Sequence, residues 1–150
     1  MAILTILQYP DKRLHTIAKP VPTVTPEIRQ LVQDLTETMY AAPGIGLAAT
    51  QVDKHLQVIV LDISTTQDQL QVFINPQIIV SSGESECEEG CLSVPDVYEK
   101  VRRAEQITVR ALNEQGKVFI LEAQGMLATC IQHEVDHLKG RVFVEYLSTL

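Results

Sequence analysis

The residues best suited to chemistry lie together late in the chain, in the segment His133-Glu134-Val135-Asp136-His137. Residues i and i+4 lie on one face of a helix, so both imidazoles can reach a single metal ion. Glu134 lies on the neighbouring face, where its carboxylate could act on water at that metal. A Zn²⁺ or Fe²⁺ hydrolytic site needs this arrangement of nitrogen ligands and a proton shuttle. A surface helix with two solvated histidines is the alternative, but apolar neighbours such as Ile131 and Leu138 indicate a buried helix.

A third metal ligand has to come from elsewhere in the chain, because a catalytic metal usually takes three protein ligands. The segment after His137 holds one carboxylate, Glu145, and no histidine. We therefore look upstream, where Cys91 is the best candidate. Its alternative role is that of a buried structural thiol, which is the interpretation favoured for Cys87 and Cys130. A redox pair of Cys87 and Cys91 is a further alternative.

A loop of small residues occupies residues 44–51, which read GIGLAATQ. Gly44, Gly46 and Ala49 fit the loose G-x-G-x-x-A pattern of dinucleotide binding, which requires a strand before the loop and a helix after it. Here a predicted helix precedes the loop and a predicted strand follows it, so we reject nucleotide binding. The small residues indicate instead a tight loop pressed against a ligand backbone or the metal helix. Gln51 could stabilise an oxyanion or cap the loop with its amide.

The spacing of apolar residues predicts two helices. The first begins after Thr25, a favoured N-cap, with Pro26 in the first helical position, and it ends at Ala42-Pro43-Gly44. The second covers about residues 124–139 and carries the His-Glu segment. The apolar positions of the first helix are Ile28, Leu31, Val32, Leu35 and Met39, and those of the second are Met126, Leu127, Cys130, Ile131, Val135 and Leu138.

Strand-like segments rich in β-branched residues occupy residues 57–62, 71–80, 107–112 and 117–122. The last two flank a good turn sequence and predict a hairpin. Pro76 indicates a sheet edge or a bulge, because proline cannot donate to a ladder of hydrogen bonds. The fold expected is α+β, with antiparallel β-sheets packed around a central helix that carries the HExxH metal motif.

Composition places the chain among folded globular proteins. It has 150 residues, 45% of them hydrophobic and 21% charged, and this length suits one domain. The net charge of −7 argues against a general nucleic-acid binder or a binder of anionic membranes. No apolar run is long enough for a membrane span, and the N-terminus lacks a signal-peptide pattern. Three cysteines are too few for a disulfide framework, so we expect a cytoplasmic location.

An acidic segment, residues 84–89, holds four glutamates, which is typical of a solvated strand. Glu89 could instead pair with Arg102 or Arg103. Asp136 could orient a group behind the metal ligands or form a surface ion pair.

Three segments together carry a resemblance to a known family. They are residues 44–51 (GIGLAATQ), 89–93 (EGCLS) and 132–137 (QHEVDH). In this order and spacing they resemble the peptide deformylases, which remove the N-terminal formyl group from nascent bacterial or organellar proteins. The resemblance covers essentially the whole chain, so it implies that residues 1–150 form a single deformylase-like catalytic domain.

The resemblance implies roles for particular residues of these segments. The metal ligands would be Cys91, His133 and His137, the general acid and base would be Glu134, and the oxyanion would be stabilised by Gln51 and the backbone N–H of Leu92. Family members usually hold Fe²⁺ and often accept Ni²⁺, Co²⁺ or, with less activity, Zn²⁺. The implied substrates are N-formylmethionyl peptides of nascent chains, from which formate is released.

Selectivity for a formyl group needs a tight site, which we expect around Gly46 and Leu92. The methionine side chain needs an apolar slot, and residues on one face of the second helix could line it together with Ile45. These helix residues are Met126, Thr129, Cys130 and His133, although Met126 and Cys130 could equally be core residues. The rest of the peptide could pair as an extra strand with the backbone near Gly44, Ile45 or Gly90.

Many bacterial relatives continue into a basic C-terminal helix that helps to dock the enzyme on the ribosome. This sequence ends at Leu150 without such a helix, which would fit either a naturally short form or a missing tail. The ending and the net charge of −7 argue against ribosome docking. Neither a membrane nor a specific nucleic acid is expected as a partner.

Two other functions remain in competition. A zincin-like metallopeptidase uses the same helix motif, but the absence of a downstream ligand and the Gly-Cys-Leu-Ser segment argue against it. An inactive relative that binds metal or peptide is the second. In an inactive relative, some of the residues that the reaction needs would be expected to be replaced. Cys91, Glu134 and Gln51 are intact in this sequence, which argues against that function.

Overall fold

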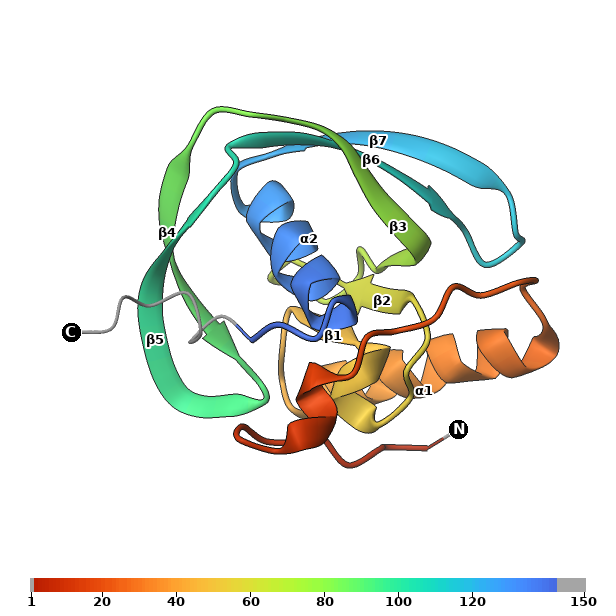
Figure 1. The fold of residues 1–150 in the computed structure, drawn as a ribbon. Helices are drawn as coiled ribbons and strands as arrows, with labels where there is room; N and C mark the ends of the chain where they lie inside the picture. Colours follow the sequence, from red (N-terminus) through yellow and green to blue (C-terminus); the bar gives the residue numbers. More distant parts are fainter. Residues whose placement is uncertain (1, 143–150) are drawn as a thin grey trace.

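The computed structural model describes residues 2–142, apart from the side chain of Asp96, and its fold is α+β, as the sequence predicted (Figure 1). A five-stranded antiparallel sheet has the order β1-β2-β3-β6-β7, and β4 and β5 form a separate two-stranded sheet. The strands are β1 (Gly46–Ala48), β2 (Val58–Leu61), β3 (Gln71–Ser82), β4 (Ser85–Cys91), β5 (Val94–Arg103), β6 (Gln106–Leu112) and β7 (Val118–Gln124). The helices are α1 (Pro26–Ala41) and α2 (Gly125–Leu138), with short 3-10 turns η1 (Lys12–His15) and η2 (Ala49–Val52). Glu145 lies outside the described residues.

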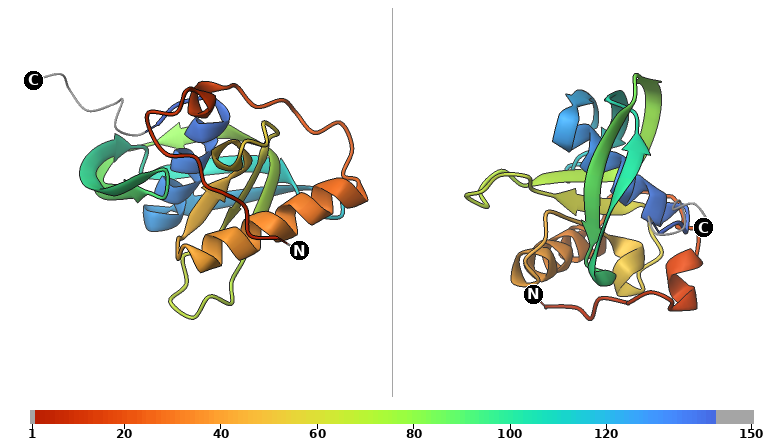
Figure 2. Two further views of the ribbon diagram at one scale, coloured as in Figure 1. Left: turned by 90° about the horizontal axis from the view of Figure 1, so that it is seen from below. Right: turned by 90° about the vertical axis from the view of Figure 1, so that its left-hand side faces the viewer.

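Helix α1 forms where its sequence signals predicted it. The side chain of Thr25 accepts a hydrogen bond from the backbone N–H of Ile28, and all five residues of the predicted apolar stripe are buried. This stripe packs against β1 and β2, where Leu35 shares a core cluster with Val58 and Val60. The helix thus supports β1 and its neighbour β2 from one side (Figure 2). Within residues 2–142, no helix has the length and apolar character needed to cross a membrane.

Strand β3 contains Pro76, which the sequence assigned to a sheet edge or a bulge. The strand lies between β2 and β6, but β2 pairs only with Gln71–Ile74, so Pro76 lies beyond that pairing and its β2 side is locally a sheet edge. The other prediction, a bulge, is confirmed by a shift of the β3–β6 register between Ile74 and Gln77. A bulge leaves a residue outside the ladder, which is where a missing N–H can be tolerated.

Helix α2 packs one face onto the inner side of the five-stranded sheet. Ala128, Ile131 and Val135 join a buried cluster with Phe73 and Val109. Figure 1 shows β4 and β5 on the other side of the helix. Most of the predicted apolar positions are buried or partly buried, but Met126 is 58% exposed. Met126 lies in the first turn, at the N-terminal end of the helix. The apolar spacing alone therefore assigned it wrongly to the buried face.

Asp62, directly after β2, is a buried carboxylate that ties three segments together. It accepts hydrogen bonds from the hydroxyl of Tyr40 at 2.6 Å and from the backbone N–H groups of Ser64 and Gln69. Its own backbone N–H donates to the carbonyl of Ile45 at 2.8 Å, which extends the β1–β2 pairing. The loop of residues 63–70, which projects from the body in Figure 2, is anchored in this way.

These contacts make stability depend on pH. Burial alone would raise the pKa of Asp62, but the hydrogen bonds from Ser64 and Tyr40 outweigh it and lower the pKa to about 2. A depressed folded-state pKa contributes stability above the unfolded-state value of 3.8, and this contribution is lost as the pH falls towards about 2. We therefore expect Asp62→Asn to lower the free energy of unfolding at pH 7 and to matter less at pH 2.5.

The measurement is urea unfolding of both proteins across this range. Asp68→Asn is the matched control, because Asp68 lies exposed in the same loop. If Asp62→Asn lowered the free energy of unfolding by the same amount at every pH, the proposed role of the Asp62 carboxylate would be contradicted.

Candidate metal centre and groove

Three ligand-type atoms converge at one point between β4 and α2. The thiol of Cys91 lies 3.3 Å from Nε2 of His137, and the Nε2 atoms of His133 and His137 are also 3.3 Å apart. All three ligand atoms lie within 4.8 Å of one another. The structure therefore brings together the two histidines of the helix motif and the upstream cysteine that the sequence singled out.

The bend of the β4–β5 hairpin delivers Cys91 to this point. The register of the two strands shifts between Glu89 and Cys91, and Cys91 then pairs with Val94 across the turn. Gly90 allows a close approach, because a Cβ there would lie 2.5 Å from the ring of Tyr98. The backbone conformation does not itself require a glycine here, since Gly90 does not have a positive φ.

The donor set fits a divalent transition metal. One thiol and two imidazoles are ligands that such ions favour. Two imidazole nitrogens that face each other at 3.3 Å could share only one proton, whereas a metal would use both lone pairs. The buried Nδ1 of His137 and Oε1 of Glu134 have no hydrogen-bond partner among residues 2–142, so the described part of the chain leaves two polar atoms beside the ligand cluster unsatisfied.

Glu134 is buried directly against the glycine loop. A Cβ added to Gly46 would lie 2.6 Å from Oε2 of Glu134, so strand β1 can pass the carboxylate only because residue 46 is a glycine. This confirms the prediction of a small-residue loop pressed against the motif helix. Burial raises the pKa of Glu134 to about 7. A carboxyl group with such a pKa can both take and return a proton near neutral pH.

Gln51 makes the loop-capping contact that the sequence allowed, and its amide nitrogen points towards the candidate metal ligands. Its Oε1 accepts a hydrogen bond from the backbone N–H of Ala48 at 2.9 Å, which caps the loop. Its Nε2 donates to the hydroxyl of Ser93 at 3.0 Å and approaches the sulfur of Cys91 at 3.6 Å. The capping contact thus orients the amide so that its N–H groups face the candidate metal ligands.

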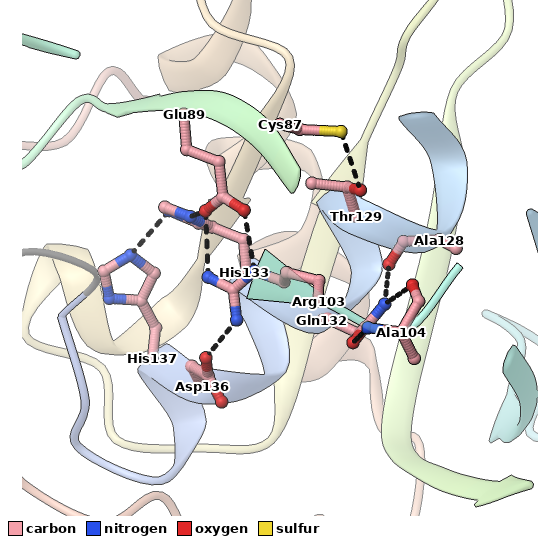
Figure 3. Close-up of polar contacts among 10 residues, drawn as sticks. All are labelled: Cys87, Glu89, Arg103, Ala104, Ala128, Thr129, Gln132, His133, Asp136 and His137. Atoms are coloured by element: carbon pink, nitrogen blue, oxygen red, sulfur yellow. Dashed lines mark hydrogen bonds and ion pairs between the residues drawn. The ribbon is translucent and has the colours of Figure 1, made fainter. Parts of the chain in front are cut away.

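His133 has a charged partner behind it, shown in Figure 3. Its Nδ1 lies 2.8 Å from Oε1 of Glu89, and Glu89 pairs with Arg103, one of its two predicted partners. Burial would raise the pKa of Glu89, but Arg103 and His133 outweigh it and lower that pKa. Burial would lower the pKa of His133, but hydrogen bonds with Cys91 and Glu89 raise it to about 10. Burial and the nearby charge of His133 lower the pKa of His137.

A groove of about 890 Å³ opens beside these groups. The predicted site residues that line it are Gly44, Ile45, Gly46, Gln51, Gly90, Cys91, Leu92, His133 and Glu134. Met126, Thr129 and Cys130, expected along a methionine slot, are not among its lining residues. Thr129 and Cys130 are buried, and Thr129 donates to the sulfur of Cys87 at 3.8 Å.

The groove also has lining residues that the sequence did not reveal, among them Ile6, Gln8 and Tyr98. The N-terminal segment reaches the groove through a backbone hydrogen bond from Leu7 to Gln51 at 2.7 Å. No local pattern marks such a contact, because its partners are far apart in the sequence. Tyr98 could have been found by pairing the strands around Gly90.

A half-buried thiol, two buried imidazoles and a buried carboxylate beside an open groove define a metal-dependent hydrolase. The sequence model described as polypeptide deformylase matches residues 3–150. The chain belongs to this family. It is thus a hydrolase of protein biosynthesis, which removes the N-formyl group from nascent peptides.

Individual relatives agree with this assignment. Peptide deformylase 2 of Nitrosomonas europaea is 65% identical over 148 residues, which cover 99% of this chain and 80% of that protein. The crystal structure of a peptide deformylase from Legionella pneumophila superimposes with a TM-score of 0.94 at 49% identity, covering 97% of this chain and 86% of that one. A deformylase from Ehrlichia chaffeensis, solved with actinonin, gives a TM-score of 0.93 at 41% identity, with 99% and 91% covered.

The contact between Gly46 and Glu134 predicts a selective loss of activity. Gly46→Ala would place a methyl group where Oε2 of Glu134 lies, so the carboxylate has to move. Because a displacement of about 1 Å in a catalytic group can cost roughly 100-fold in rate, we expect a loss of this order in kcat/KM with formyl-Met-Ala-Ser. Metal content is expected to stay near wild type, and thermal unfolding of the same protein is expected to show that the variant is folded, with some loss of stability from the added methyl group. Full activity of the folded variant would show that the position of this carboxylate is unimportant.

Proposed function

We propose that Cys91, His133 and His137 hold one divalent metal ion and that Glu134 is the general acid and base of the deformylation. The convergence of the three ligand atoms within 4.8 Å carries this proposal. The buried carboxylate of Glu134 beside Gly46 supports it. The bound ion supplies Lewis acidity and makes water a nucleophile near neutral pH.

For the ion itself we propose Fe²⁺, with Zn²⁺, Ni²⁺ or Co²⁺ as substitutes. A thiolate ligand donates charge and softens the site relative to three nitrogen ligands. The resemblance to the deformylase family favours iron among the ions that such a set can hold.

The residues of the chain then have separate roles in the reaction. Glu134 takes a proton from water as the water oxygen attacks the formyl carbon. Negative charge develops on the carbonyl oxygen, where Nε2 of Gln51 and the backbone N–H of Leu92 donate hydrogen bonds. Glu134 returns the proton to the leaving nitrogen, the C–N bond breaks, and formate and a free N-terminal methionine result.

Substrate selection follows from the narrow end of the groove. Gly46 and Leu92 surround the reacting carbon closely, which would admit a hydrogen substituent and exclude a methyl group. Strand β1 is an edge strand of its sheet, so the backbone near Gly44 and Ile45 can accept the peptide as an added strand, with Gly90 opposite. Met126, Thr129 and Cys130 remain the predicted lining of a methionine slot.

We place this activity in the cytoplasm, with residues 1–150 acting as one catalytic domain on N-formylmethionyl peptides. Formate release by metal-loaded, oxygen-protected protein separates the competing functions. A deformylase releases formate from formyl-Met-Ala-Ser, a zincin-like peptidase cleaves the unformylated peptide, and an inactive relative does neither.

The role of Glu134 predicts a variant that binds metal without turning over. In Glu134→Gln the amide cannot accept the proton of water, so we expect kcat to fall by about 10²–10⁴-fold, the usual contribution of a general base. Metal content by elemental analysis is expected to equal that of wild type. Retained turnover of formyl-Met-Ala-Ser would remove Glu134 from this role.

The role of Cys91 predicts a loss of metal. Cys91→Ser replaces a thiolate with a much poorer ligand, so the isolated protein is expected to hold less metal and to lose it faster to a chelator. Cys87→Ser is the matched control, since Cys87 is also a half-buried cysteine of β4. Equal metal retention by the two variants would take Cys91 out of the ligand set.

A further inference from the structure

A buried ionic network lies behind His133, on the Nδ1 side of its ring, whereas His137 faces Nε2 (Figure 3). Arg103, the last residue of β5, donates through Nε and Nη2 to the two oxygens of Glu89 at 2.7 and 2.8 Å. Its Nη1 donates to Asp136 on α2 at 2.5 Å. One guanidinium therefore binds a carboxylate of the β4–β5 sheet and a carboxylate of the motif helix.

The burial of this network makes its pairing important. The side chains of Arg103, Glu89 and Asp136 are 7%, 5% and 15% exposed. A buried ion is costly unless it is paired, and removing one partner leaves the others uncompensated. Without the guanidinium, two carboxylates would remain close together with little access to water.

The hydrogen-bond geometry connects this network to the candidate metal ligand. Oε1 of Glu89 receives Nη2 of Arg103 and also lies 2.8 Å from Nδ1 of His133. A carboxylate only accepts hydrogen bonds, so Nδ1 donates its proton to Glu89, and Nε2 is the nitrogen that a metal would bind. The bidentate contact with Arg103 holds the carboxylate in one orientation.

We propose that Arg103 is a positioning residue of the metal centre, which acts through Glu89 to orient the ring of His133. This inference rests on the proposed ligand set. By binding Glu89 and Asp136 together, Arg103 also holds the strand pair that supplies Cys91 at a fixed distance from the helix that supplies both histidines.

A second contact joins the same two elements, α2 and the end of β5, so the effect of Arg103 on metal binding can be tested in a protein that still folds. The amide of Gln132 accepts from the backbone N–H of Ala104 at 3.0 Å and donates to the carbonyl of the same residue at 2.9 Å. This uncharged contact already joins α2 to the chain directly after β5. We therefore expect a variant without Arg103 to fold.

The test compares Arg103→Met with Arg102→Met. Both remove one positive charge from neighbouring positions of β5, but the side chain of Arg102 is 76% exposed, and its one ion pair within residues 2–142 is with Glu86 at 3.5 Å. The measurement is the dissociation constant for Co²⁺, from chelator competition with metal-free full-length protein. We expect Arg103→Met to weaken binding by about 10–100-fold, the usual effect of losing a group behind a metal ligand. Arg102→Met is expected to bind as wild type does, and equal binding by the two variants would overturn the proposal.

A double-variant cycle distinguishes action through Glu89 from a general structural effect. If Arg103 acts through Glu89, adding Arg103→Met to Glu89→Gln is expected to weaken Co²⁺ binding little further. Losses that add in full would contradict the proposed route. Should thermal unfolding show that Arg103→Met does not fold, Arg103→Lys carries the test. It keeps the charge without the bidentate contact, so weakened binding supports the proposal and unchanged binding overturns it.

Failure of the underlying ligand set would look different. If wild type did not bind Co²⁺, or if Cys91→Ser bound it as tightly as wild type, the proposed metal centre itself would be wrong. The role of Arg103 alone would be overturned by a different set of results. In that case wild type would bind Co²⁺ tightly, Cys91→Ser would bind it clearly more weakly, and Arg103→Met would bind it as wild type does.

Discussion

Burial of polar groups on helix α2 is the constraint from which the geometry of the site follows. His133, Glu134 and His137 are all buried, and buried polar groups destabilise a protein unless they are paired. His133 and His137 face each other on the helix, with their Nε2 atoms 3.3 Å apart, and the opposite face of the helix packs on the five-stranded sheet. Their other partners come from the β4–β5 hairpin, which brings Cys91 and Glu89 to the helix. The requirement for pairing thus places strand and helix residues around one point.

The same constraint explains why the glycine loop has so little freedom. Strand β1 passes the buried carboxylate of Glu134 at a distance that leaves no room for a side chain on Gly46. The strand is held there by its pairing with β2 and by α1 behind it. Because Gln51 follows in the next turn and is itself capped on Ala48, its amide meets Cys91 without further adjustment. The fold fixes the reacting groups in advance, which is how enzymes reduce the cost of reorganisation during the reaction.

Much of this arrangement could be predicted from the sequence, where the signals are local. The cap at Thr25, the apolar stripe of α1 and the i, i+4 pair of histidines all depend on residues a few positions apart. The exposure of Met126 and the approach of Ile6 to the groove could not be predicted in this way. Each depends on which segments meet in space. Arg103 was one of two candidates for Glu89, and only the register of β4 and β5 decides between them.

The central claim is that one sulfur and two imidazole nitrogens bind the metal, and X-ray absorption spectroscopy tests it most directly. The zinc-loaded protein is expected to show one sulfur neighbour at about 2.3 Å and two imidazole nitrogens at about 2.0–2.1 Å. Cys91→Ser would remove the sulfur contribution and leave the two nitrogens. A wild-type spectrum with no sulfur neighbour, or with three imidazoles, would contradict the account.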